Sequence, residues 1–193
     1  LKQTYPDIFQ NFWLSQDRFN DMTKQVDIRS KDDWRLLEIA CSYHDLGKMN
    51  LRFQKKVKAG QSFCKGEIPH ALLSITMLPI DELQKHYTKD QIIALIFAIK
   101  WHHERNFSEI DEKHYEDEIE DLKKEFASFD YSKLSFPIPP QEPAKVDSKY
   151  LTGNLSHRLS PNYEPKIYDE FVILKGLLNR IDYAASGHYE IES

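Results

Sequence analysis

The chain has 193 residues, of which 40% are hydrophobic and 30% are charged, a composition that is ordinary for one globular domain. No apolar run approaches the ~18 residues that a membrane span requires, and the first residues lack the basic and apolar regions of a signal peptide. The two cysteines form neither a disulfide framework nor a zinc-finger pattern, which favours the reducing cytoplasm. The net charge of −5 argues against binding nucleic acid through bulk charge, although a local basic site stays open.

Helical patterns dominate the first part of the chain. Apolar positions recur at helical spacing from Asp32 to Tyr43, and Gly47 is expected to end that helix. A short basic helix is expected over Lys48–Lys58. Pro69 is typical of a helix start, so the next helix is expected over His70–Leu78.

The remaining elements are also helical in pattern. The run Thr88–Gln91 is a capping box that opens a helix apolar nearly all round, so this helix should be central. An acidic amphipathic surface helix is expected over Glu109–Phe126, followed by a proline-rich extended loop and, last, a long helix over Lys166–Ser186. Strand alternation, internal repeats and glycine-rich phosphate motifs are missing from the sequence. It therefore predicts a single all-α domain spanning residues 1–193.

Histidine and aspartate recur at the ends of these apolar helices and on the inner side of the last one. In chain order they are His44-Asp45, His70, His102-His103 and Asp182. Each has a plainer interpretation by itself, such as a histidine that compensates a helix dipole or an aspartate in an ion pair. Together they match the way helix bundles build metal sites, from side chains on facing helices, and imidazole with carboxylate suits transition metals. Adjacent helical residues point ~100° apart, so one ion can be bound by both His44 and Asp45 only at a loosened helix end.

Five short motifs carry a resemblance to a known family. They are His44-Asp45-Leu46-Gly47-Lys48, Arg52-Phe53-Gln54, Ile68-Pro69-His70, Trp101-His102-His103-Glu104-Arg105 and Ile181-Asp182-Tyr183-Ala184-Ala185-Ser186. The first is the signature of the HD phosphohydrolase superfamily. The whole succession, over roughly residues 31–190, resembles the HD nuclease domain of the CRISPR-associated type I interference helicase-nuclease.

This resemblance implies a compact helical bundle with two divalent transition-metal ions between its helices, drawn from iron, manganese, cobalt and nickel. It implies that Asp45 bridges the two ions, that His44 and Asp182 hold one, and that the other is held by His70, His102 and His103. Asp45 and Lys48 are the implied catalytic residues, with Lys48 steadying a phosphate beside the metals. Ser186 is expected to touch the site from the last helix.

Local charge indicates where a substrate would lie. Residues 46–66 carry six Lys and Arg and no acid, whereas residues 104–125 have a net charge of −6. The basic segment begins at the metal motif and could guide a nucleic-acid backbone to it, although a solvated basic face is the alternative. The predicted substrate-binding residues are Lys48, Arg52, Lys55, Lys56 and Ser186.

The resemblance also implies the substrate and the partners. It points to endonucleolytic degradation of single-stranded DNA in CRISPR antiviral defence, with a helicase domain or subunit in cis or in trans, an RNA-guided surveillance complex and no membrane. The family has a further histidine upstream of the HD motif, and none precedes His44 here. The start at Leu1 favours a ligand that lies before the chain begins, and no helicase follows, so the chain is expected to be a stand-alone subunit or a domain of a larger protein.

Two other functions stay open on the sequence. One is an HD phosphohydrolase that acts on nucleotides or cyclic dinucleotides, and the other is a catalytically degenerate HD module that docks a helicase to a surveillance complex. The histidine pair and the Arg52-Phe53-Gln54 run favour the nuclease.

Overall fold

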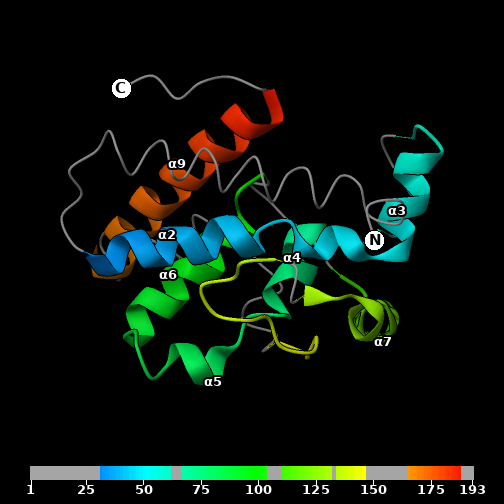
Figure 1. The fold of residues 1–193 in the computed structure, drawn as a ribbon, viewed down its shortest axis with the longest axis horizontal. Helices are drawn as coiled ribbons and strands as arrows, with labels where there is room; N and C mark the ends of the chain where they lie inside the picture. Colours follow the sequence, from blue (N-terminus) through cyan, green and yellow to red (C-terminus); the bar gives the residue numbers. More distant parts are fainter. Residues whose placement is uncertain (1–30, 62–66, 104–109, 132–133, 147–164, 188–193) are drawn as a thin grey trace.

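The structure, a computed structural model, describes residues 31–61, 67–103, 110–131, 134–146 and 165–187. Across these residues every regular element is a helix and no strand occurs, which confirms the predicted all-α class (Figure 1). In chain order the elements are α2 (Lys31–Tyr43), the 3-10 helix η1 (Leu46–Met49), α3 (Leu51–Lys58), α4 (His70–Ile75), α5 (Ile80–Leu83), α6 (Lys89–Lys100), α7 (Glu112–Ser128) and α9 (Pro165–Gly187). That residues 1–193 form one domain stays a prediction.

Helix α6 lies at the centre of the fold. Its start is the predicted capping box, in which the Thr88 hydroxyl accepts from the Gln91 N–H and the Gln91 side chain accepts from the Thr88 N–H. Every residue from Ala94 to Lys100 is buried, and the helix packs against α2, α4 and α9. Burial on all sides explains its nearly continuous apolar sequence. Just after the helix ends, His102 is buried in the interior and His103 lies at its exposed edge.

Helix α9 runs obliquely across α2 and α6 (Figure 1). Its buried face follows the predicted spacing of three and four, with Phe171, Leu174, Leu178 and Ile181 inside. Asp182 comes next on this inner side and is only 4% exposed, although it is a carboxylate. None of the described helices combines the length and the apolar character that crossing a membrane would need.

Gly47 has a different role from the one predicted. Helix α2 ends at Tyr43, before the glycine, and Gly47 lies inside η1. A Cβ atom at Gly47 would lie 2.0 Å from the carbonyl oxygen of His70 and 2.8 Å from the backbone nitrogen of Ser74. Gly47 is therefore needed because η1 and α4 pack backbone to backbone, and any larger residue would separate them.

The predicted helix over His70–Leu78 is shorter than expected. Helix α4 ends at Ile75, and the next three residues tighten into turns whose N–H groups bond to the third carbonyl back. The cause is Pro79, since a residue before proline avoids the helical conformation. Proline 79 also precedes α5, a short helix that the sequence did not predict.

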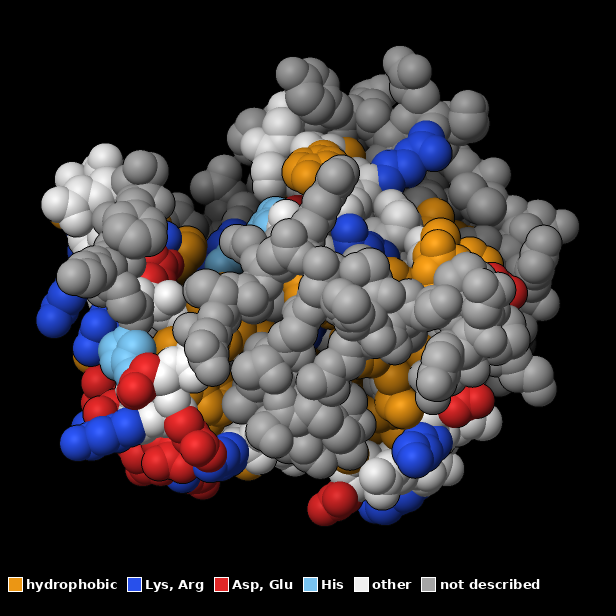
Figure 2. Space-filling model, turned by 180° about the vertical axis from the view of Figure 1, so that it is seen from behind, with side chains coloured by type: hydrophobic (Ala, Val, Ile, Leu, Met, Phe, Trp, Pro, Cys, Tyr) orange, Lys and Arg blue, Asp and Glu red, His pale blue; other side chains and the backbone are white. Residues whose placement is uncertain are grey.

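Helix α7 begins at Glu112 rather than Glu109, because the Asp111 side chain accepts the His114 N–H and caps the helix there. Figure 2 shows acidic side chains gathered over this helix, at the lower left of the view. The opposite face is buried and packs against η1 and α3. This face includes the carboxylate of Glu118, which accepts a hydrogen bond from Asn50 and pairs with Arg52. The helix is therefore a support for the η1–α3 segment as well as a solvated surface.

The proline-rich segment 134–146 is extended, as predicted, and lies along the end of α4. The Gln141 and Ala144 N–H groups donate to the carbonyls of Met77 and Thr76, at 3.1 and 3.0 Å. The Tyr43 hydroxyl donates to the Ile138 carbonyl at 2.8 Å. The continuation of this loop to residue 164 lies outside the described residues.

Candidate metal centre

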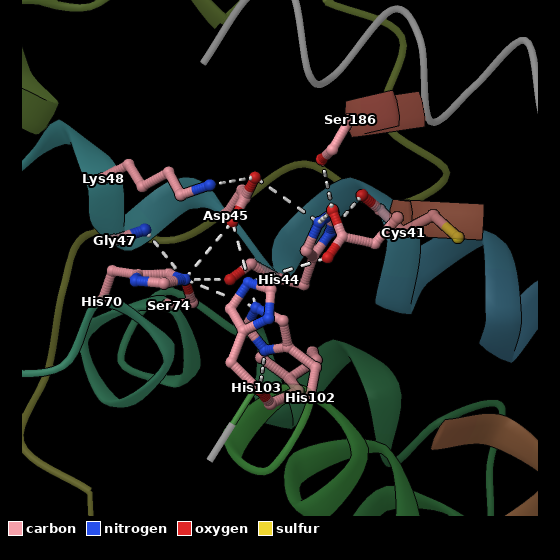
Figure 3. Close-up of polar contacts among 12 residues, drawn as sticks. Cys41, His44, Asp45, Gly47, Lys48, His70, Ser74, His102, His103 and Ser186 are labelled. Atoms are coloured by element: carbon pink, nitrogen blue, oxygen red, sulfur yellow. Dashed lines mark hydrogen bonds and ion pairs between the residues drawn. The ribbon is translucent and has the colours of Figure 1, made fainter. Parts of the chain in front are cut away.

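Six side chains that the sequence singled out converge at one point in the bundle (Figure 3). We call them the ligand cluster: His44, Asp45, His70, His102, His103 and Asp182. They come from four places, namely the turn after α2, the start of α4, the end of α6 and the inner face of α9. Segments up to 138 residues apart in the chain, from residue 44 to residue 182, therefore meet here.

The two carboxylates lie among the imidazoles. Nε2 of His44 lies 3.5 Å from Asp45 Oδ2 and 3.5 Å from Asp182 Oδ1. On the other side, Asp45 Oδ1 is 3.4 Å from His70 Nε2 and 4.0 Å from His102 Nε2. Asp45 thus turns one oxygen toward each half of the cluster, as expected of a bridging carboxylate.

Two groups of possible ligand atoms result, each with all its atoms within 4.8 Å of one another. One group is Asp45, His70, His102 and His103, and the other is His44, His102 and Asp182. The sequence assigned His102 to the first of these alone, whereas the geometry places its Nε2 within reach of both. His103 is also close to the second group, with its Nε2 3.6 Å from Asp182 Oδ2.

Backbone carbonyls orient two of the histidines. Nδ1 of His44 donates to the carbonyl of Cys41 at 2.9 Å, and Nδ1 of His102 donates to the carbonyl of Ile99 at 2.5 Å. A carbonyl only accepts, so in both rings the proton lies on Nδ1 and the lone pair on Nε2, which faces the cluster. Metal-binding histidines are commonly held in this way.

The residues present fit a metal ion. Among the described residues, Nε2 of His44 is buried yet has no hydrogen-bond partner, which is costly unless another group occupies the position. Nε2 of His70 and Nε2 of His102 lie 3.4 Å apart and both face inward. Imidazole nitrogens with carboxylate oxygens form a donor set that suits divalent transition metals better than an all-oxygen site does.

The protonation states follow from burial and from neighbouring charges. Burial tends to raise the pKa of Asp45, but His44 and Lys48 outweigh it and hold that pKa well below its usual value. Burial, reinforced by the nearby His44, moves the pKa of His102 far below its usual value, and burial also lowers the pKa of His103. Ionised carboxylates and neutral imidazoles are the forms that bind metal.

The pKa of His44 moves the other way. Burial tends to lower it, but the carboxylates of Asp45 and Asp182 outweigh burial and raise it. The two carboxylates therefore favour positive charge at this position, and a metal ion would supply it in place of a proton.

Lys48 and Ser186 lie beside the cluster, as the sequence predicted (Figure 3). The Lys48 ammonium donates to Asp45 Oδ2 at 2.7 Å. The backbone carbonyl of Lys48 accepts a hydrogen bond from the Gln54 side chain at 2.6 Å. The Ser186 hydroxyl lies 3.4 Å from Asp182 Oδ1. Each is therefore in contact with one of the two carboxylates.

The other predicted substrate-binding residues divide into two kinds. Arg52 pairs with Glu118, and Lys56 pairs with Glu67 at 2.5 Å, so both turn toward acidic side chains. Lys55 is exposed and forms no ion pair within the part of the chain described here, and the same holds for its neighbour Lys58, which was not among the predicted residues. The lysine at position 65 lies outside the described residues.

The aromatic residues next to the histidine and basic motifs differ in exposure where the structure describes them. Trp101 is fully buried and belongs to the core. Phe53 is partly exposed beside the cluster, with its ring centroid 5.6 Å from that of His70 and 4.6 Å from the Lys56 ammonium. Phe107 lies outside the described residues.

The four other histidines of the chain are not part of the ligand cluster where the structure describes them. His86 lies on the surface 3.3 Å from Glu82, and His114 is on α7, where its Nε2 is 3.9 Å from the buried Glu118. His157 and His188 lie outside the described residues.

Sequence reasoning missed the buried Ser74. Its hydroxyl contacts the turn that carries His44 and Asp45. The only local signal is its spacing of four from His70, which places both residues on one face of α4.

Comparison with known families agrees with this geometry. The family model described as "Cas3, HD domain" matches residues 8–158, more than half of the chain. The match contains five members of the ligand cluster and ends before Asp182. The place of Asp182 in the cluster therefore rests on the structure and not on the family match. No curated protein and no solved structure shows significant similarity to the chain. The chain thus combines an HD motif, a helical bundle and a convergent His/Asp cluster with a family match over most of its length. It belongs to the Cas3 HD domain family, a family of HD-type nucleases of CRISPR interference.

Proposed function

We propose that this protein is a metal-dependent endonuclease that hydrolyses phosphodiester bonds of single-stranded DNA in type I CRISPR interference. The observation that carries the proposal is the convergence of the ligand cluster from four segments of a Cas3 HD domain. Two groups of ligand atoms, with one oxygen of Asp45 turned toward each half of the cluster, favour two neighbouring ions, and His102 would bind one of them because its Nε2 has a single lone pair.

The proposed ions are two divalent transition metals from the set iron, manganese, cobalt and nickel, held by the six members of the ligand cluster. When bound, such a pair makes hydroxide available near neutral pH and offsets the negative charge of the phosphate. Asp45 would face both ions, because its two oxygens point to the two halves of the cluster.

Lys48 is the proposed second catalytic residue. Its ammonium now bonds to Asp45, is only 14% exposed and lies at the edge of the cluster. If ions took over the charge of Asp45, this ammonium would be available to a non-bridging oxygen of the scissile phosphate. A fixed cation there stabilises the charge that develops on the phosphate in the transition state.

A backbone path for the DNA is proposed over α3. Lys55 and the partly exposed Phe53 are available to it, whereas Arg52 and Lys56 would have to exchange carboxylate partners for phosphates. Ser186 would contact the strand on the α9 side. The proposed partners are a helicase in cis or in trans, which supplies unwound strand, and an RNA-guided surveillance complex, which supplies the target.

The test compares single-stranded DNA with a panel of nucleotides and cyclic dinucleotides, using protein loaded with Mn²⁺, Co²⁺ or Ni²⁺. The unaltered chain is expected to cut single-stranded DNA, chelator is expected to stop the reaction, and Asp45→Ala is expected to abolish it. Asp81→Ala, which removes an exposed carboxylate on α5, is the matched control and should cut normally.

Each of the other outcomes has a definite meaning. Cleavage that survives Asp45→Ala would remove the proposed site. Hydrolysis of nucleotides without cleavage of DNA would establish the other HD phosphohydrolase function instead. Tight metal binding with neither activity would leave the docking module as the better interpretation.

A further inference from the structure

The turn after α2 has an unusual geometric task. Successive residues of a helix point ~100° apart, so His44 and Asp45 would diverge if α2 simply continued. In the structure both side chains face the ligand cluster, with His44 Nε2 3.5 Å from Asp45 Oδ2. Some group must open the chain at this position. We call residues 44–47 the HD turn.

The hydroxyl of Ser74 occupies the inside of the HD turn (Figure 3). It donates to the His44 carbonyl at 2.8 Å and accepts from the Gly47 N–H at 2.8 Å. In a tight turn the carbonyl of one residue bonds directly to the N–H three residues later. Here the Ser74 hydroxyl lies between the His44 carbonyl and the Gly47 N–H, so these two groups are farther apart than in a tight turn.

The surroundings keep this hydroxyl in place. Ser74 is fully buried, at 0% exposure, and lies on α4 four residues after His70, so one helix face carries both residues. Gly47 brings the turn against that face, since a Cβ there would collide with the His70 carbonyl. Helix α4 therefore supplies a member of the ligand cluster and, one helical turn later, the group that shapes the HD turn.

We propose that Ser74 is a positioning residue that opens the HD turn so that His44 and Asp45 face the same metal centre, an inference that rests on the proposed function. Its hydroxyl touches neither the ions nor the substrate. It bonds to the main chain of His44 and of Gly47, at the two ends of the HD turn, and so ties that turn to α4, the helix that carries His70.

A buried hydroxyl can also be purely structural, and Thr76 provides the matched comparison. Thr76 is 1% exposed and its hydroxyl donates to the Leu73 carbonyl at 2.6 Å, within the end of its own helix. Ser74→Ala and Thr76→Val each remove one buried hydroxyl from the same short segment. Only the first removes a bond to the HD turn.

The experiment measures Co²⁺ affinity by calorimetry, the absorption spectrum of bound Co²⁺, and the unfolding temperature of the metal-free protein. Ser74→Ala is expected to weaken Co²⁺ binding by about 10–100-fold, the usual effect of losing a group that orients metal ligands. It is also expected to change the spectrum, because His44 and Asp45 no longer converge. Thr76→Val is expected to lower the unfolding temperature while leaving affinity and spectrum unchanged.

Ser74→Cys covers the case in which Ser74→Ala fails to fold, since it leaves no cavity and keeps a weak donor on a somewhat larger sulfur atom. If both variants fold, the Co²⁺ affinity of Ser74→Cys should lie between that of the unaltered protein and that of Ser74→Ala. If only Ser74→Cys folds, its Co²⁺ affinity should be lower than that of the unaltered protein. Unchanged affinity and spectrum in the folded Ser74 variants would overturn the inference, and so would an equal loss of affinity in Thr76→Val. Absence of Co²⁺ binding in the unaltered protein would instead overturn the proposed function, and the inference with it.

Discussion

His44 and His102 are held by the same arrangement at the ends of two different helices. Each ring donates its Nδ1–H to the carbonyl three residues back, in Cys41 and in Ile99. The last carbonyls of a helix have no partner inside the helix, so they are free to accept such a bond. One contact thereby satisfies the helix end and aims Nε2 at the ligand cluster.

At this scale the clearest prediction concerns His44. His44→Ala is expected to reduce the number of transition-metal ions bound per chain. Nuclease activity should fall by at least roughly 10–100-fold, which is the usual effect of losing a group that only supports a metal ligand. The physical reason is that Nε2 of His44 faces both Asp45 and Asp182. Elemental analysis of the dialysed protein and an assay on single-stranded DNA measure the two effects.

His86→Ala is the control, because His86 is exposed on the surface, where its side chain meets Glu82 and the ring of Tyr87 rather than the ligand cluster. It should leave metal content and cleavage unchanged. Equal metal content in His44→Ala and in the unaltered chain would exclude His44 as a ligand.

Among the elements, η1 and α4 lie backbone against backbone at the site. Gly47 permits it, since a Cβ there would lie 2.0 Å from the His70 carbonyl oxygen. The obstacle is backbone, so no side-chain rotation can relieve the clash. The helix pair must then separate, which moves the HD turn away from His70.

Gly47→Ala is therefore expected to destabilise the fold by about 1–3 kcal/mol or more, as overpacking does. Gly176→Ala is the matched control within α9, where an added Cβ meets nothing within 4 Å. In the middle of a helix this change should stabilise by about 0.5–1 kcal/mol. Urea denaturation of the two variants measures both values, and a shift of the same sign in both would contradict the packing role of Gly47.

On the scale of the whole molecule, the ligand cluster joins α2, α4, α6 and α9, helices that also pack on one another through the apolar core. Asp45 and Asp182 are buried and ionised, and their pKa values lie below the usual range despite burial. An ion that binds the folded chain alone would therefore tie α2, α4, α6 and α9 together and stabilise them.

Adding Mn²⁺ or Co²⁺ at a hundred times its Kd is expected to stabilise the fold by about 2.7 kcal/mol. For a chain of this size that corresponds to a rise in Tm of roughly 5–10 °C. Thermal unfolding with and without chelator measures the shift. Asp45→Ala should unfold at the same temperature under both conditions, and an equal rise in that variant would show that the ions act elsewhere.

Much of the fold could be predicted because its main helices are set by local patterns. Helix α6 follows from the capping box at Thr88 and an apolar run, and α9 follows from the spacing of its buried residues. Helix α5 was missed because it depends on a turn around Pro79, and Gly47 was misread because its neighbour, His70, is distant in sequence.

The candidate site could be predicted in its members but not in its supports. Each member of the ligand cluster is a residue type whose chemistry is evident from the sequence. The contact of Ser74 with the HD turn is not evident, nor is the pairing of Arg52 with Glu118, which lies 66 residues further along the chain. A count of local charges treats Arg52 as available to DNA, whereas the fold gives it an acidic partner.

The position of Asp182 late in the chain has a consequence for biosynthesis. During translation His44, Asp45 and His70 leave the ribosome well before α9, and domains are made from the N-terminal end at roughly 5–20 residues per second. The group formed by His44, His102 and Asp182 cannot assemble until α9 has been made and has docked on α2 and α6. A nascent or prematurely terminated chain that lacks α9 can thus form at most the group of Asp45, His70, His102 and His103. The complete cluster forms only after α9 is in place.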